Sequence, residues 1–255
     1  MLENLISIAR KTSIKAPYWT QGAGGNISYK SEDDSSLVIK ASGIRLDEMS
    51  LEKGYVELDL AKIKNYFLGK QKKDENSYKN VIKSANLNKK SEIKASMETG
   101  FHAVLPLKYT IHFHSIASMI MADLFRKNNR KFIKFLYEQG KEIQFLPILK
   151  PGLELSLKIQ VNKISPIYIL ENHGVVLNSN SPHILDEWTS FEENFCKAFG
   201  YQEGLTHEPE NQTKQLKVYF PDFAIFEEKI HSCLVQHESD LKFDPDKVTK
   251  NKDSY

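Results

Sequence analysis

The first 60 residues alternate between apolar and polar positions in ways that predict one helix and three strands. Apolar residues recur at the spacing of a single helical face over residues 2–9, so a short amphipathic helix is expected there. Two short β-like runs, 26–30 and 37–41, flank an acidic turn and predict a β-hairpin. Residues 55–60 alternate as a half-buried strand does.

The rest of the chain predicts a mixture of helices and strands. Helices are expected at 92–105, 115–125, 131–139 and 181–198. Strands are expected at 109–114, 143–149, 167–170 and 175–177. Residues 69–90 are rich in Lys, Asn and Ser, which indicates an exposed insertion or flexible loop. We therefore expect one domain over 1–237, interrupted by that insertion, and a polar C-terminal tail at 238–255.

Composition and charge narrow the class of protein. The chain has 255 residues, 40% of them hydrophobic, which suits one large α/β domain or two small ones. Its 35 Lys and Arg nearly balance 33 Asp and Glu, so no basic field exists for a nucleic-acid backbone. Two cysteines fit a reducing compartment, and neither a signal peptide nor a run of roughly 18 uncharged apolar residues is present. We expect a soluble cytoplasmic protein without nucleic-acid or membrane partners.

The first candidates for chemistry are His112 and His114, on the strand expected at 109–114. Side chains two apart on a strand share a face, roughly 6.6 Å apart, so two imidazoles can converge on one divalent metal. Two ordinary strand histidines would give the same pattern. Glu98 and His102 lie four apart in the helix expected just before, and either can reach a metal held by the strand. Taken alone, they also fit a surface glutamate and a partly buried histidine.

A third candidate is His173, which follows the apolar run 167–170 and precedes Gly174. Glycine permits a sharp turn, so this histidine is well placed to face a cleft, although a simple turn has the same pattern. Taken together, these candidates indicate a metal site more strongly than any one of them does alone. Three histidines from strand contexts and one carboxylate match a catalytic zinc site that leaves a position open to substrate or water.

Glycine-rich turns at 24–28 and 41–43 suggest a second kind of site. Hydroxyls and exposed amide N–H groups in such turns can cradle a phosphate, although Gly-Gly and Ser-Gly turns are common in all proteins. Neither G-x-x-x-x-G-K-[ST] nor a G-x-G-x-x-G that opens a strand–helix unit is present, so the turns are not a nucleotide P-loop.

The chain resembles the class II aldolase/adducin family, which includes fuculose-phosphate and rhamnulose-phosphate aldolases. The resemblance rests on motifs in a fixed order: GGNIS, ASG, S-x-E-x-x-x-H, HFH and NHG. It extends from about Leu2 to Phe226, and the spellings KASG, METGFHAVLP and FPDFAIF are most similar to the aldolase half of rhamnulose-phosphate aldolase/dehydrogenase fusions. It implies a three-layer α/β/α fold with a mostly antiparallel central sheet, assembled as a homotetramer with sites near subunit interfaces.

The resemblance also implies an activity and a set of residues. The activity would be zinc-dependent cleavage of a ketose 1-phosphate to dihydroxyacetone phosphate and an aldehyde, with another divalent metal as an alternative to zinc. The implied metal ligands are Glu98, His112, His114 and His173, with Glu98 also able to leave the metal and act as acid/base. The implied contacts to the substrate phosphate and carbonyl region are Gly25, Asn26, Ser28, Ser42, Gly43 and Ser96.

Two departures from the fuculose-phosphate branch affect these expectations. Ser96 is followed by Met97 where that branch has a second serine, which removes one hydroxyl from the expected phosphate pocket. That branch also uses a tyrosine near the C-terminus to protonate the leaving alkoxide, and Tyr201 and Tyr219 are the candidates here.

Other functions stay open on the same motifs. A sugar-phosphate epimerase, dehydratase or decarboxylase would need the same metal site. A non-catalytic, adducin-like interaction module would be marked by loss of the metal ligands, and this chain keeps all of them.

Overall fold

A computed structural model describes residues 1–16, 18–88, 93–162 and 164–201. Within these residues, seven strands form one sheet in the order β3-β2-β1-β4-β7-β6-β5. The strands are β1 (Asn26–Lys30), β2 (Ser36–Lys40), β3 (Tyr55–Asp59), β4 (Tyr109–Phe113), β5 (Ile143–Leu146), β6 (Ile167–Leu170) and β7 (Gly174–Ser179). Neighbouring strands pair antiparallel, apart from the parallel pair β5–β6. The expected mostly antiparallel central sheet is confirmed.

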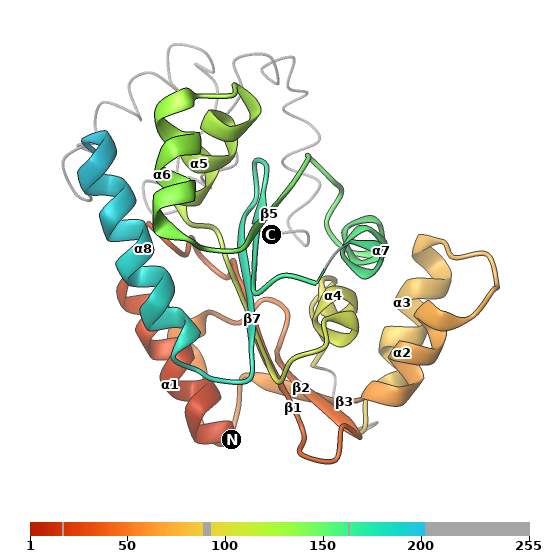
Figure 1. Ribbon diagram of the computed structural model, residues 1–255. Helices are drawn as coiled ribbons and strands as arrows, with labels where there is room; N and C mark the ends of the chain where they lie inside the picture. Colours follow the sequence, from red (N-terminus) through yellow and green to blue (C-terminus); the bar gives the residue numbers. More distant parts are fainter. Residues whose placement is uncertain (17, 89–92, 163, 202–255) are drawn as a thin grey trace, which may run out of the picture.

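Helices cover both faces of this sheet, as Figure 1 shows with the sheet nearly edge-on. One layer contains α1 (Leu2–Ile14), α5 (Ile116–Arg126), α6 (Arg130–Gln139) and α8 (Ile184–Phe199). The other contains α2 (Leu60–Leu68), α3 (Glu75–Ala85), α4 (Thr99–Val104) and α7 (Leu153–Val161). A 3₁₀ helix, η1, spans Leu46–Glu48. The three-layer α/β/α architecture is thus confirmed, and none of the described helices has the length and apolarity to cross a membrane.

Alternation along β4 decides which layer each of its side chains faces. Ile111 and Phe113 pack in the core shared with α1, α5, α6 and α8. His112, between them, points to the other face, where its ring meets the edge of Phe101 on α4 with ring centroids 5.7 Å apart. The strand period therefore places this histidine beneath α4.

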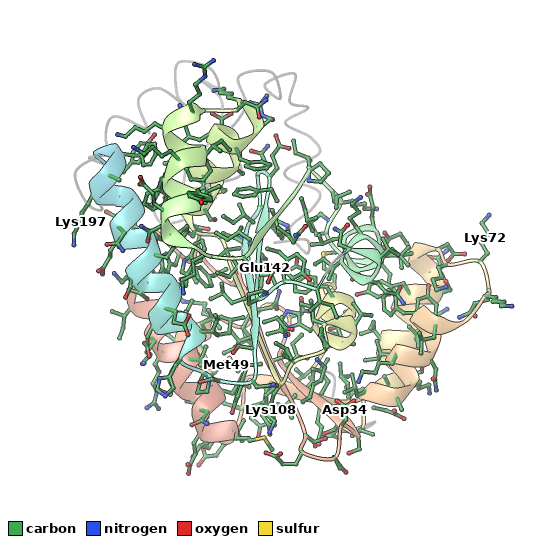
Figure 2. All side chains as sticks on the ribbon, viewed as in Figure 1. Asp34, Met49, Lys72, Lys108, Glu142 and Lys197 are labelled. Atoms are coloured by element: carbon green, nitrogen blue, oxygen red, sulfur yellow. The ribbon has the colours of Figure 1, made fainter. Side chains whose placement is uncertain are left out.

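Residues 69–88, the described part of the stretch 69–90, are not the exposed loop that their composition indicates. Helix α3 occupies half of this stretch, and its N-cap residue is Asp74, whose side chain accepts a hydrogen bond from the Ser77 amide. Tyr78 and Ile82 are buried in a core cluster with residues of α2 and the sheet. The polar residues that dominate the composition face outward, as Lys72 does at the connection between α2 and α3 (Figure 2). A narrow apolar stripe was enough to bury one helix face.

Candidate metal centre

Three histidine side chains meet where β4 ends and where β6 turns into β7. The ligand-capable nitrogens of His112, His114 and His173 all lie within 4.8 Å of one another. Their ring centroids are 4.8 to 5.1 Å apart. His112 is buried, whereas the other two are partly exposed. The three histidine candidates from the sequence therefore form one cluster at the boundary between core and solvent.

His112 directs an acceptor atom into this cluster. Its Nδ1 lies 2.9 Å from the backbone oxygen of Val175, and because a carbonyl only accepts, Nδ1 carries the proton. Nε2 is then the acceptor, buried and without a hydrogen-bond partner among the described residues. A backbone carbonyl that fixes one ring nitrogen in this way is a common means of orienting a metal-binding histidine.

The turn that carries His173 depends on two positive-φ positions. Asn172 has a φ of 61° and Gly174 a φ of 141°. A Cβ on Gly174 would lie 2.2 Å from the backbone oxygen of Phe113. Only glycine therefore allows β7 to begin this close to the end of β4, which is what brings His173 beside His114.

Glu98 approaches the cluster from the helical layer. It is the N-cap residue of α4, which begins at Thr99 and not at the expected residue 92. Its Oε2 lies 3.5 Å from His112 Nε2, and its Oε1 lies 3.3 Å from His173 Nε2. Asn26 Nδ2 donates a hydrogen bond of 2.7 Å to Oε2, whereas Oε1 has no hydrogen-bond partner among the described residues. The carboxylate thus faces two of the three histidines.

The electrostatics of the cluster favour a cation. Burial lowers the pKa of His112 and of His173 to about 4, so both rings are neutral at pH 7. Neutral imidazole is the form that binds metals. Among the described residues, His112 Nε2 and Glu98 Oε1 are buried polar atoms without hydrogen-bond partners. A divalent ion with nitrogen and oxygen ligands would satisfy both, so these residues fit the metal that the resemblance implies.

Strand β1 holds α4 over the sheet through alternate side chains that share one face. Asn26 binds the carboxylate at the start of α4, as described above. Ser28 Oγ lies 2.7 Å from His102 Nδ1 in the middle of the helix. Lys30 Nζ donates to the backbone oxygen of Leu105 at its end. The position of the carboxylate over the histidines is therefore set by β1.

Lys40, which begins KASG but was not among the predicted site residues, connects the two glycine-rich turns. Its Nζ donates to the backbone oxygens of Ala23 at 3.0 Å, Ala41 at 3.3 Å and Ile44 at 2.6 Å. Burial lowers its pKa to about 8, so the ammonium is largely charged at pH 7. The signal in the sequence was a charged residue at the end of the apolar run 37–39.

The two turns lie against the elements of the metal cluster. Gly25 has a φ of 79°, and a Cβ on it would lie 2.9 Å from the backbone oxygen of His112. Gly43 has a φ of 77° with open space where a side chain would be. The Ser42 amide donates a hydrogen bond of 2.9 Å to the backbone oxygen of Lys94, on the segment that leads to the metal-facing carboxylate.

A family model named Class II Aldolase and Adducin N-terminal domain matches residues 3–198. The chain belongs to this family. Among curated proteins, none matches the chain.

Solved structures show the same fold as this class II aldolase and adducin family member. The N-terminal class II aldolase domain of a conserved protein from Thermoplasma acidophilum has 22% identity and a TM-score of 0.63, covering 76% of this chain and 92% of that one. An L-fuculose 1-phosphate aldolase has 18% identity and a TM-score of 0.52, covering 86% and 96%. A sugar-phosphate aldolase from Thermotoga maritima has 14% identity and a TM-score of 0.53, covering 81% and 97%.

The remaining predicted site residues of this family member are buried close to α4. Ser96 Oγ accepts a hydrogen bond of 3.2 Å from the Glu98 amide. The Ser28 hydroxyl is directed at His102, and both side chains are buried. His102 is not part of the histidine cluster found in the described residues. The substrate contacts of Ser28 and Ser96 stay predictions.

Trp19, close to the turn at 24–28, and the two tyrosine candidates have different placements. Trp19 is buried and stacks on Phe113, with ring centroids 4.5 Å apart, so it belongs to the core. Tyr201 stacks on Phe195 at the end of α8. Tyr219 lies outside the described residues.

Proposed function

We propose that the chain is a divalent-metal-dependent aldolase that cleaves a ketose 1-phosphate to dihydroxyacetone phosphate and an aldehyde. The observation that supports this most is the convergence of the three histidines and Glu98, with buried acceptor atoms on His112 and Glu98 and neutral rings at His112 and His173. These four residues would hold the metal, with zinc as the first candidate. The ion would supply a Lewis acid that polarises a substrate oxygen.

Glu98 is the proposed acid/base. Cleavage between C3 and C4 of the ketose leaves C3 of the three-carbon product in need of a proton, while the C4 hydroxyl loses its proton as it becomes the aldehyde. The amide of Asn26 occupies Glu98 Oε2, which leaves Oε1 to carry the proton to C3. General acid–base catalysis needs such a positioned oxygen within hydrogen-bond reach of the reacting carbon.

The substrate phosphate is proposed to bind at the two glycine-rich turns, with Gly25, Asn26, Ser28, Ser42, Gly43 and Ser96 as the contacting residues. Lys40 supports this binding because its ammonium is bound by the backbone oxygens of Ala23, Ala41 and Ile44, which lie in or directly beside the turns. The amides of Gly24, Ala41 and Ser42 already donate to backbone oxygens, so the phosphate would bind the N–H groups of Gly25 and Gly43. The buried positive charge adds attraction for a phosphate.

The homotetramer that the resemblance implies, and the cytoplasmic location expected from the sequence, are part of the proposal. Sedimentation of the purified protein tests the tetramer independently of activity.

The test of function is metal content combined with cleavage of a panel of ketose 1-phosphates that includes fuculose 1-phosphate. We expect about one zinc per chain and chelator-sensitive release of dihydroxyacetone phosphate. The unphosphorylated sugars serve as controls, and equal cleavage of both forms would refute the phosphate site. Stoichiometric metal without cleavage, with a changed sugar by NMR, would replace the aldolase by an epimerase, dehydratase or decarboxylase. Failure to bind any divalent metal would favour an adducin-like module.

A further inference from the structure

A buried carboxylate lies on the opposite face of the sheet from the metal cluster. Glu192 of α8 is 3% exposed. Its Oε1 accepts a hydrogen bond of 2.6 Å from Trp19 Nε1. Its Oε2 accepts bonds of 2.7 Å from Trp188 Nε1 and from Ser115 Oγ. An indole N–H can only donate, and an ionised carboxylate only accepts, so the donor set suits the charged form.

Two of these donors belong to residues that flank or hold His114. Ser115 follows His114 directly in the chain. The backbone oxygen of Trp19 accepts a hydrogen bond of 2.9 Å from the His114 amide. The indole of Trp19 also stacks on Phe113, the residue before it. One carboxylate therefore joins α8 to both sides of the histidine.

The backbone of His114 depends on such contacts because it lies beyond the last residue of β4, Phe113. Strand pairing with β7 also ends at Phe113. Beyond Phe113, the segment around residues 18–21 supplies the hydrogen bonds to the backbone. Gln21 Nε2 donates to the backbone oxygen of His114 at 3.3 Å, and the Ile116 amide donates to the oxygen of Tyr18 at 3.0 Å.

We propose that Glu192 is a positioning residue for the metal centre. By binding Trp19 and Ser115 together, it fixes the backbone on which His114 approaches the metal. This inference rests on the proposed function, because it concerns the ion that the aldolase would use. A buried charge is costly and is retained only when fully hydrogen-bonded, which this carboxylate achieves through the residues around His114.

The third donor offers a matched control. Trp188 lies on α8, one turn before Glu192, so its hydrogen bond stays within that helix. Its ring meets Phe113 only edge-on, with ring centroids 6.4 Å apart, whereas Trp19 stacks on Phe113 at 4.5 Å. Trp188 and Trp19 are both buried and both donate an indole N–H to this carboxylate. Replacing either tryptophan by Phe removes one indole N–H donor to the Glu192 carboxylate.

The substitution Glu192→Gln keeps the shape of the side chain but replaces one acceptor by an NH₂ donor. In either orientation that NH₂ faces an indole N–H, from Trp19 or from Trp188, so one hydrogen bond is lost and two donors oppose each other. Glu193→Gln removes the same charge from an exposed neighbour on the helix and is the control for charge.

The experiment titrates the purified full-length protein with Co²⁺ and records both the affinity and the visible absorption bands. We expect Glu192→Gln and Trp19→Phe to bind Co²⁺ about tenfold or more weakly, with altered bands, as happens when groups that orient metal ligands are removed. Trp188→Phe and Glu193→Gln are expected to match the parent within about twofold. Loss of stability alone would not produce this split, because Trp188→Phe disturbs the same core.

Parent-like affinity and bands in Glu192→Gln would overturn the inference, as would equal weakening by the two Trp→Phe variants. If Glu192→Gln does not fold, the two Trp→Phe variants decide the outcome by themselves. Absence of Co²⁺ and Zn²⁺ binding by the parent would be a different result, because it would refute the proposed metal-dependent function and the inference together.

Discussion

Asn26 donates a hydrogen bond of 2.7 Å to Glu98, joining the first residue of β1 to the residue that caps α4. Both side chains are buried. The amide occupies one carboxylate oxygen and leaves the other to face His173. A strand residue thus decides which oxygen of the carboxylate is available for chemistry.

Asn26→Asp should destabilise the metal-free protein at pH 7, because two carboxylates would then share one buried site. We expect the free energy of unfolding in urea to fall by about 1–3 kcal/mol relative to the parent. The loss should shrink as the pH falls toward 4, since the folded variant then binds a proton between the two groups and gains stability. Asn26→Ala is the control, and a similar pH dependence in that variant would contradict the explanation.

Glu98→Gln should retain part of the metal affinity but lose turnover, because the amide can no longer carry a proton. A loss of about 10²–10⁴-fold in kcat is expected for a general acid/base. Metal content and kcat should be measured on the same preparation. Glu171→Gln removes a carboxylate that instead pairs with Arg126, so it controls for charge. Turnover of Glu98→Gln close to the parent's would remove Glu98 from the mechanism.

Tyr78→Phe should impair the site from a distance. The Tyr78 hydroxyl accepts from the Gly100 amide at 2.8 Å and donates to the backbone oxygen of Met97 at 2.6 Å, so it binds the chain on both sides of Glu98. Its removal leaves two backbone groups unpaired and should cost about 1–3 kcal/mol of unfolding free energy. We also expect a lower kcat with little change in KM.

Tyr66→Phe is the matched control for that variant. Tyr66 belongs to the same aromatic cluster, but its hydroxyl binds Ser77 and the backbone of Asp74, within and before α3. It should lose stability without loss of kcat. If both variants keep the parent's kcat, the support of Glu98 by α3 is not functional.

Lys30 should make stability depend on pH in the alkaline range. Burial, and to a smaller degree the charge of Lys64, lowers its pKa from 10.5 to about 7. Between pH 7 and 10.5 the unfolded chain therefore binds more protons than the folded one, so the free energy of unfolding rises with pH, by at most about 1.4 kcal/mol per pH unit.

Lys30→Met should flatten this rise, whereas Lys53→Met, at an exposed position, should keep it. Urea unfolding at pH 7, 8 and 9 provides the measurement, and the contribution of other titrating groups cancels between variants. A parent and a Lys30→Met protein with the same slope would show that Lys30 is charged in the folded state throughout this range.

Much of the sheet was predictable because its strands are short apolar runs with clear boundaries. The run 167–170 became β6 without any shift, and 109–114 became β4 with one residue fewer. Helix α3 was not predicted because its narrow apolar stripe lies among many Lys and Asn residues, whose composition is typical of a loop. Leu153–Val161 alternates with period two, which is typical of a strand, and is nevertheless helix α7. Packing against α4 and the sheet overrides the local pattern there.

The residues of the candidate site were also predictable only in part. The three histidines and Glu98 could be identified because each lies in a short motif and the motifs follow a fixed order. Tyr78 and Glu192 lie in no such motif, and Lys40 begins KASG without its contacts being evident from that motif. The Trp19–Glu192 bond joins residues 173 positions apart, and neither residue type nor spacing indicates such a contact. Such contacts form only when the helical layers pack on the sheet, so no local sequence pattern predicts them.

The four candidate metal ligands lie on backbone segments that differ in stability. The histidines belong to a strand end and a tight turn of one sheet, whereas Glu98 is the N-cap residue of a helix of six residues. So short a helix has little cohesion of its own and opens when its contacts with β1 and α3 open. A local opening of α4 can therefore move the Glu98 carboxylate away from the three imidazoles without displacing the imidazoles. Retention of the ion and release of its acidic neighbour would then be governed by separate parts of the fold.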